Sequence, residues 1–172
     1  VGKILPCFRL KLQEDEILVR GDSVMIGYYK DKELTDSVLT DGWFHTGDLG
    51  ALDKNGFLHI TGRKKNLIVL KNGKKVSPEE IETRVSQLPL VKEVIAYGAS
   101  IGEAKDSARL AVMIYPDPDK TQGMNSYEVL NLLQKQIDEL NLEYPSYKQI
   151  QLVNLRETPF EKTSAQKIKR QI

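Results

Sequence analysis

The alternation of strand-like and helix-like segments between residues 66 and 154 constrains the fold of this chain more than any other feature. Residues 125–140 have the spacing of one buried helix face, with apolar side chains at 129, 130, 133, 137 and 140. β-Branched and apolar runs at 91–100, 109–116 and 147–154 predict strands on both sides of that helix. Two strands, a helix and a third strand are therefore expected at the end of this region.

A hairpin and a shorter helix are predicted before these strands. The runs "NLIVL" and "KKVS" flank Asn-Gly at 72–73, a dipeptide that favours a type I′ turn with positive φ at both positions. Ser77 and Glu80 form the pattern of a capping box, with Pro78 at the first helical position and a helix to about Gln87. The order β, α, β, β, α, β predicts an α+β domain with helices packed on an antiparallel or mixed sheet.

The first third of the chain is rich in residues that favour β-structure. Strands are expected at 16–21 and 23–29, where β-branched and aromatic residues are concentrated. A short helix is expected at 31–39, with Asp31 as its N-cap. This part of the chain is therefore predicted to be a β-rich piece with one helix.

A glycine-rich segment and a hairpin follow that helix. Residues 41–50 hold three glycines and two aspartates, which is typical of a loop. Residues 51–62 alternate as a hairpin that turns at Asn55-Gly56. Because the pattern changes after Gly62, we place a domain boundary within residues 63–66.

Composition excludes several classes of function. Twenty-five basic and 24 acidic residues give a net charge of +1, which argues against a nucleic-acid partner bound by bulk electrostatics. Cys7 is the only cysteine, so no internal disulfide can form, and a reducing, cytoplasmic setting fits. No run approaches the ~20 apolar residues of a membrane helix. With two separated histidines and no clustered ligands, no metal site is expected.

Charged and glycine residues mark four places for chemistry, each with a plainer structural alternative. Asp48 lies between glycines and can accept two hydrogen bonds from a vicinal diol, or it can cap a turn. Arg63 and Lys65 can bind phosphate at a boundary between domains, or they can be exposed charges on a strand edge that prevent aggregation. Gly73 can admit another molecule close to the backbone, or serve the turn alone.

The fourth place is the basic C-terminal segment, which contains Lys162, Lys167, Lys169 and Arg170. One of these lysines can neutralise charge that develops on a transferring phosphoryl group. The alternative is a solvated basic tail, which is the commoner case.

Four segments in this order resemble motifs of the adenylate-forming acyl-CoA synthetases, a superfamily that also holds the luciferases and the adenylation domains of peptide synthetases. The segments are "GDSVMIGYYKD", "DGWFHTGDLG", "GRKKNLIVLKNGKKVSPEEIE" and "PFEKTSAQKIKR". The resemblance implies that residues 1–62 are the β-rich end of a large N-terminal domain. It also implies a hinge at 63–66 and a small mobile C-terminal domain at 67–172. We therefore expect a fragment of a longer protein, inactive alone.

The resemblance implies two half-reactions and a role for each matching residue. The carboxylate of a fatty acid attacks the α-phosphate of Mg-ATP to give an acyl-adenylate and pyrophosphate, and the thiol of coenzyme A then attacks the adenylate to give a thioester. Asp48 would hold the ribose hydroxyls and Arg63 would contact ribose or phosphate. Lys65 would occupy the hinge, and Gly73 would line the passage for pantetheine. Lys167 would be the catalytic lysine of adenylation. ATP, Mg²⁺ and coenzyme A are the implied cofactors, with the Mg²⁺ ligands in the missing N-terminal domain.

One departure from the common motif affects the substrate expectation. Gln166 stands where relatives usually have glycine before the catalytic lysine, and "QKIKR" is similar to the long-chain acyl-CoA synthetases. Fatty acid, ATP and coenzyme A are thus the expected partners, while peripheral membrane contact and oligomeric state stay open. A carrier protein as acyl acceptor and a non-catalytic binding module are the alternatives. Lys71, Lys74 and Lys75 either meet coenzyme A phosphates or are simply solvated.

Overall fold

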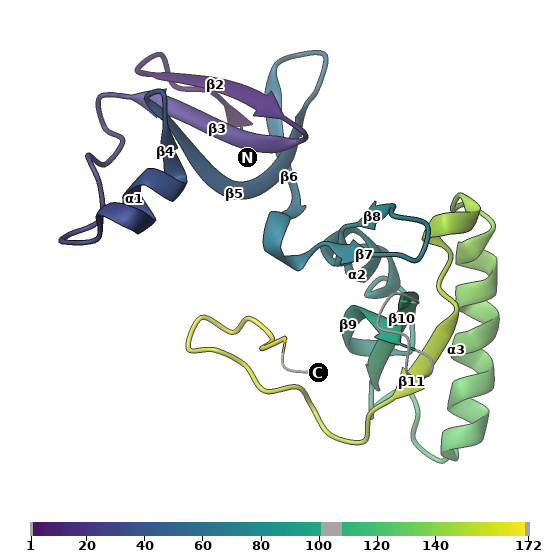
Figure 1. Cartoon of the computed structure of the whole chain (residues 1–172). Coiled ribbons are helices and arrows are strands. Elements are labelled where there is room, and N and C mark those ends of the chain that lie inside the picture. The colour runs from purple at the N-terminus through teal and green to yellow at the C-terminus, as the bar shows by residue number, and fades with distance from the viewer. Residues whose placement is uncertain (1, 101–107, 171–172) are drawn as a thin grey trace. The chain divides into compact units, whose positions relative to one another are not determined.

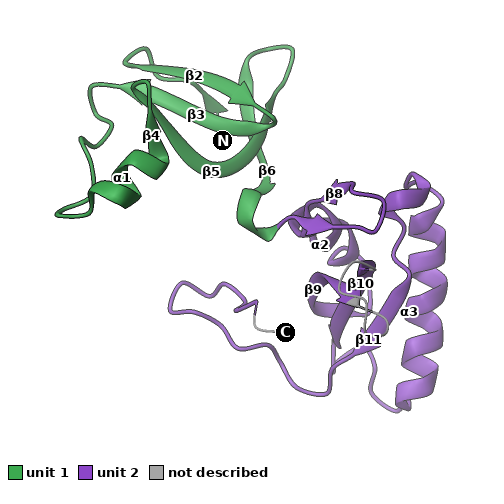
Figure 2. Cartoon of the chain, viewed as in Figure 1, with its two compact units in different colours: residues 1–66 green, residues 67–172 purple. Residues whose placement is uncertain are grey.

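The chain forms two compact units that meet in sequence between Asn66 and Leu67. The computed structural model describes residues 2–100 and 108–170. One unit covers Val1–Asn66 and the other Leu67–Ile172 (Figure 2). The division falls at the end of the segment 63–66, where the sequence pattern changes. Each unit has its own sheet, and each is described by itself below.

The first unit is a six-stranded antiparallel sheet with one short helix (Figure 1). The strands run in the order β1-β6-β5-β3-β2, and β4 pairs with β5. The elements are β1 (Gly2–Lys3), β2 (Phe8–Gln13), β3 (Glu16–Gly21), α1 (Lys32–Val38), β4 (Leu39–Thr40), β5 (Trp43–Leu52) and β6 (Phe57–Arg63). A 3-10 turn, η1 (Lys64–Asn66), ends the unit.

Two predictions for this unit are wrong, while the strand at 16–21, the hairpin that turns at Asn55-Gly56 and the cap of the short helix are confirmed. Residues 41–50 are mostly strand, because β5 pairs with β3 on one side and with β6 on the other. Residues 23–29 form no strand; Ile26 is fully exposed, so this apolar run has no partner strand to pack against. Asp31 caps α1 as predicted, since its carboxylate accepts the Leu34 N–H at 2.9 Å.

One glycine of the predicted loop, Gly47, lies in a bulge of β5. Leu18 pairs with His45 and Glu16 with Leu49, so residues 46–48 lie opposite Ile17 alone. The extra residues need a turn of the backbone, which Gly47 supplies with φ +69°. The bulge therefore converts a loop-like sequence into a continuous strand with a kink.

The second unit packs two helices on one face of a mixed three-stranded sheet. In this sheet β9 (Val91–Ser100) pairs antiparallel with β10 (Ala108–Pro116), and β10 pairs parallel with β11 (Leu152–Leu155). Before the sheet come the hairpin β7 (Ile68–Val69) and β8 (Lys75–Val76) and the helix α2 (Pro78–Val85); α3 (Ser126–Asn141) and the 3-10 turn η2 (Ser146–Lys148) precede β11. The predicted order β, α, β, β, α, β and the α+β class are confirmed.

The predicted helix face of α3 lies in the core of this unit. Its buried residues are Val129, Leu133, Ile137 and Leu140. They share one cluster with Ile81 and Val85 of α2 and with alternate residues of β9 and β10. Both helices therefore cover the same face of the sheet. In the described part of the chain, no helix is long and apolar enough to cross a membrane.

The structure corrects two local predictions in this unit. Ser77 is the N-cap of α2 but makes no side-chain cap hydrogen bond; its hydroxyl donates to Glu79 at 2.9 Å, and the Glu80 carboxylate binds Lys148 at 2.9 Å, so no capping box forms. The β7–β8 turn is not type I′, because only Gly73 of the Asn-Gly pair has positive φ. The Leu70 N–H instead bonds the Lys74 carbonyl at 2.9 Å, which closes a three-residue loop.

Candidate functional site

Asp48 and Arg63 form an ion pair across the first unit's central hairpin. They are register partners on β5 and β6, and Arg63 Nε lies 2.7 Å from Asp48 Oδ1. The bulge fixes the backbone at Asp48, because the Thr46 hydroxyl accepts a hydrogen bond from the Asp48 N–H at 3.0 Å and donates one to the Ile17 carbonyl at 2.7 Å. Both side chains keep solvent access, with 25% of Asp48 and 52% of Arg63 exposed. In such a pair the carboxylate can accept hydrogen bonds from hydroxyl groups, and the guanidinium can donate hydrogen bonds to phosphate or sugar oxygens.

Glu16 of β3 is a buried carboxylate that binds the bulge next to Asp48 and that the sequence did not reveal. It is 5% exposed and accepts from Lys64 Nζ at 2.8 Å, Gly47 N–H at 3.2 Å and His45 Nδ1 at 3.3 Å. Burial acts to raise the pKa of Glu16, but the bonds from Lys64, His45 and Gly47 together hold it below its ordinary value. Glu16 is therefore an anion that ties the bulge of β5 to the segment after β6.

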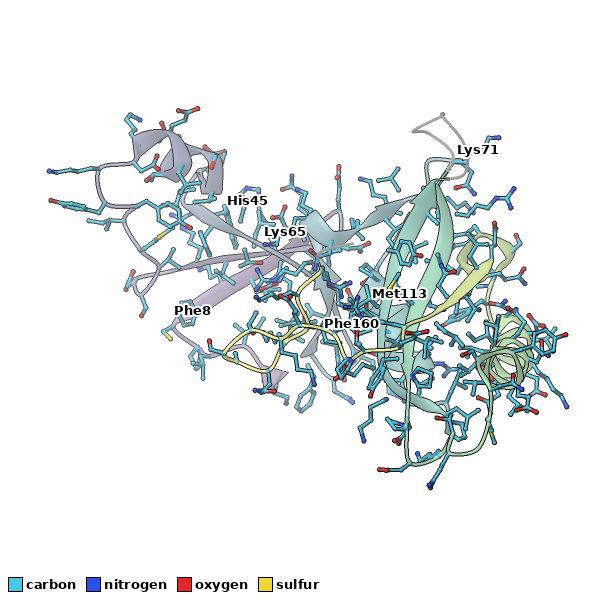
Figure 3. The ribbon with its side chains drawn as sticks, turned by 90° about the horizontal axis from the view of Figure 1, so that it is seen from below. Phe8, His45, Lys65, Lys71, Met113 and Phe160 are labelled. Atoms are coloured by element: carbon cyan, nitrogen blue, oxygen red, sulfur yellow. The ribbon has the colours of Figure 1, made fainter. Side chains whose placement is uncertain are left out.

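Lys65 lies in η1, directly before the division between the units. The neighbouring Lys64 is fixed by Glu16, and that bond raises the pKa of Lys64. Lys65, labelled with His45 in Figure 3, is exposed. Its ammonium forms no ion pair with any residue that the structure describes. Lys64 is thus anchored to Glu16, whereas Lys65, the next residue in the same turn, is exposed.

Gly73 lies at the tip of the β7–β8 hairpin with φ +74°. A Cβ at this position would meet no atom within 4 Å, so the glycine serves the turn and leaves the tip bare. Of the nearby lysines, Lys74 is engaged, because its ammonium lies 3.9 Å from the centre of the Tyr147 ring. Lys71 and Lys75 are exposed and make no ion pair with the described residues.

Lys167 lies on an exposed hairpin near the C-terminus. The Thr163 N–H bonds the Lys167 carbonyl at 2.8 Å, and the Gln166 N–H bonds the Thr163 carbonyl at 2.9 Å. Two hydrogen bonds of the same pattern close the turns at Gly56 and Gly73, where a glycine occupies the position with positive φ. Gln166 occupies that place with φ +60°, so it adopts the backbone conformation that glycine would favour. The Lys167 ammonium is exposed and unpaired among the described residues.

The predicted site residues are divided between the two units. In the first unit Asp48 and Arg63 form an ion pair and Lys65 is exposed. In the second unit Gly73 and Lys167 lie on two different exposed hairpins. Within residues 2–100 and 108–170, no group of three or more histidine, cysteine, aspartate or glutamate side chains is arranged to hold a metal ion. The chemistry offered is therefore an acidic and basic pair on one unit and a solvent-exposed cation on the other.

Comparisons with known proteins identify relatives over most of the chain. Residues 65–172 match the family described as AMP-binding enzyme C-terminal domain. The long-chain-fatty-acid–CoA ligase FadD15 of Mycobacterium tuberculosis is 42% identical over 124 residues, which are 72% of this chain and 20% of that protein. Long chain acyl-CoA synthetase 2 of Arabidopsis thaliana is 33% identical over 171 residues, 90% of this chain and 25% of that protein. The chain thus spans a fifth to a quarter of the length of these relatives.

Solved structures share the fold at low identity. The anthranilate CoA ligase AuaEII in complex with anthranoyl-AMP superposes with a TM-score of 0.78 at 22% identity, over 97% of this chain and 33% of that one. The o-succinylbenzoate CoA synthetase of Bacillus subtilis gives 0.74 at 24% identity, over 97% of this chain and 34% of that one. These two likenesses support the fold of the chain.

Proposed function

Because this chain belongs to the AMP-binding, adenylate-forming enzymes, we propose that it is the C-terminal part of an ATP-dependent ligase that joins a long-chain fatty acid to coenzyme A. The observation that carries this proposal is the 42% identity to a long-chain-fatty-acid–CoA ligase over 72% of the chain. The carboxylate of the acid would first attack the α-phosphate of ATP, which gives the acyl-adenylate and releases pyrophosphate. The thiol of coenzyme A would then attack the acyl carbon, which forms the thioester and releases AMP. The large domain that completes such an enzyme corresponds to the part of the relatives that this chain does not span.

The ion pair of Asp48 and Arg63 supports a nucleotide role. The guanidinium holds one oxygen of the Asp48 carboxylate and so orients it, and the remaining lone pairs can accept hydrogen bonds from the two hydroxyls of a ribose. The half-exposed guanidinium can donate to ribose or phosphate oxygens at the same time. No residue of this chain is assigned to Mg²⁺, since the described residues hold no cluster suited to a metal ion.

Lys167 is proposed as the catalytic lysine of the adenylation step. Its exposed ammonium would lie between the attacking carboxylate and the α-phosphate, where it would neutralise charge that develops as the phosphoryl group transfers. It would also hold the two reactants in line. In the thioester-forming state Gly73 would replace it at the site, and its bare backbone would leave room for the pantetheine thiol.

The test is to replace Lys167 with Ala in the full-length protein and to measure the two half-reactions separately. ATP–pyrophosphate exchange with a long-chain fatty acid should fall at least 100-fold, which is the range seen when a group that stabilises transition-state charge is lost. Thioester formation from presynthesised acyl-adenylate and coenzyme A should stay within about twofold, because Lys167 would be away from the site in that step. Lys169→Ala is the matched control, since among the described residues the Lys169 ammonium pairs only with the exposed Glu161 of the same hairpin.

Each other outcome has a distinct meaning. Intact exchange in the Lys167→Ala variant would remove Lys167 from the mechanism. If the acyl group is transferred to a phosphopantetheinylated carrier protein and not to coenzyme A, the carrier protein is the acceptor. No exchange in the unmodified full-length protein with any of several acids would favour a non-catalytic binding module. The 172-residue chain alone is expected to be inactive. Turnover of a fatty acid by this chain would contradict the proposal that the large domain is needed for catalysis.

A further inference from the structure

The segment that carries Lys167 has almost no apolar core to hold it in place. After β11 the chain continues through residues 156–170 as an irregular stretch, drawn in yellow-green to yellow in Figure 1. Phe160 is the only residue of this stretch that is buried. The hairpin itself is closed from within by an isolated bridge between Lys162 and Ile168 and by the Lys169 N–H to the Glu161 carbonyl. Its place on the unit must therefore be fixed by specific polar contacts.

The first contact is made by Glu93 of β9, at the start of the hairpin. One carboxylate oxygen lies 2.6 Å from Lys162 Nζ, and the other accepts the Phe160 N–H at 2.8 Å. Burial acts to raise the pKa of Glu93, but these two groups hold it below its ordinary value. The Arg156 guanidinium lies 4.9 Å from the centre of the Phe160 ring, labelled in Figure 3. Glu93 thus binds the chain on both sides of Glu161.

The second contact is made by Glu82 of α2, at the end of the hairpin. Arg170 forms a bidentate pair with it, with Nη1–Oε1 and Nη2–Oε2 distances of 2.7 and 2.6 Å. Glu82 Oε1 also accepts the Ala96 N–H at 2.8 Å, so the carboxylate is fixed to β9. A bidentate guanidinium–carboxylate pair sets orientation as well as distance. The two ends of the hairpin are therefore tied to two different elements of the folded unit.

We propose that Glu82 and Glu93 are positioning residues for adenylation, which act through Arg170 and Lys162 to hold the Lys167 hairpin on the mobile unit. This inference rests on the proposed function of Lys167. Neither carboxylate needs to touch a substrate. Their effect is to make the hairpin rotate with the unit as one body, so that Lys167 arrives at the α-phosphate already oriented. A displacement of about 1 Å at a reacting group can cost up to about 100-fold in rate.

The test breaks each contact at its exposed partner in the full-length protein, through the separate variants Arg170→Met and Lys162→Met. Both keep most of the aliphatic stem and leave Glu82 and Glu93 in place. We expect the rate of ATP–pyrophosphate exchange to fall about 10- to 100-fold, with little change in KM for ATP. Thioester formation from presynthesised acyl-adenylate should stay within about twofold. Lys169→Met is the matched control, because it removes the same charge from the hairpin but no contact to the unit.

A conservative variant and a second measurement separate position from folding. Arg170→Lys should recover part of the exchange rate, because it restores a cation but not the bidentate geometry. Hydrogen exchange of the peptide that covers residues 160–170, measured in the 172-residue chain, should speed up in Arg170→Met and Lys162→Met and not in Lys169→Met. This second measurement needs no catalytic activity.

The outcomes distinguish this inference from the proposed function. Unchanged pyrophosphate exchange in Arg170→Met and Lys162→Met would overturn it. So would an equal loss in both half-reactions, because that pattern indicates a folding defect. Faster hydrogen exchange together with an inactive unmodified full-length protein would overturn the proposed function, and with it the catalytic purpose of the two contacts. Unchanged hydrogen exchange would overturn the structural part directly.

Discussion

Replacing Glu16 with Gln tests whether the buried anion holds the first unit together. Glutamine has nearly the same shape, so only the charge and one acceptor are lost. Its amide oxygen can still accept the hydrogen bond from the Gly47 N–H. Its NH₂ group then lies against the Lys64 ammonium, and because both groups are donors they form no hydrogen bond. Lys64 is 56% exposed and can return to solvent. The variant should therefore fold with the bulge of β5 intact and with Lys64 detached.

The expected cost follows from the contacts that are lost. A hydrogen bond to a charged group contributes about 1.5–3 kcal/mol. A neutral amide costs less to bury than a carboxylate, which offsets part of that loss. We expect Glu16→Gln to lower the free energy of unfolding of this unit by about 1–2 kcal/mol at neutral pH. Asp22→Asn is the control, since Asp22 is exposed and unpaired among the described residues.

Trp43 makes the measurement specific to the first unit. It is the only tryptophan of the chain and lies on β5, two residues before His45. Urea unfolding followed by its fluorescence therefore reports on the strand that carries the bulge. The second unit contains no tryptophan and does not contribute to the signal.

The pH dependence is the sharper part of this prediction. The pKa of Glu16 in the folded chain is below its ordinary value of 4.5. Its contribution to stability is therefore fully present above pH 4.5 and is lost as the pH falls through the folded value. The difference between the wild type and Glu16→Gln should be constant from pH 6 to 8 and should shrink below about pH 4.5. A difference that is the same at pH 7 and pH 3 would refute the argument.

Two further predictions concern the exposed hairpins. Gln166→Gly should slow hydrogen exchange of residues 160–170, because glycine adopts the left-handed conformation without the cost of about 1–2 kcal/mol that a residue with a Cβ incurs. Gln166→Ala keeps the Cβ and should not slow it, and equal rates in all three proteins would contradict the strain. Lys71→Met with Lys75→Met should raise KM for coenzyme A in the full-length protein, whereas Lys74→Met should not, because Lys74 is already engaged by Tyr147. If all three lysines can be charge-reversed with no change in that KM, a role in binding phosphates is wrong.

The helices of this chain could be predicted because their information is local. The apolar face of α3 repeats within one segment, and its buried residues are those that the spacing indicates. Strand β5 could not be predicted, since its glycines and aspartates favour a loop when taken alone. It becomes a strand because β3 and β6 pair with it on both sides. Pairing partners outweigh local preference in a sheet, and sequence patterns do not name the partners.

The site shows the same division between local and distant information. Asp48, Arg63, Gly73 and Lys167 stand out because glycine and charge patterns mark them in short segments. Glu16 does not, because nothing in "EILVRG" indicates that its carboxylate will meet an ammonium 48 residues later. The same holds for the pair of Glu82 with Arg170, 88 residues apart. Such contacts exist only in the folded chain, so the groups that hold a site are harder to predict than the groups that form it.

This difference has a consequence for how loss of function should be distributed over the chain. The proposed functional residues Asp48, Gly73 and Lys167 keep access to solvent and lie on a bulge, a turn and a hairpin. The carboxylates of Glu16, Glu82 and Glu93 are mostly buried, and each binds one such segment to a strand or helix. Removal of one of them leaves the functional residue in the chain but no longer held in position. We therefore expect substitutions at Glu16, Glu82 and Glu93 to reproduce in part the kinetic defects of substitutions at Asp48 and Lys167. A survey of variants that weighted only exposed residues would miss them.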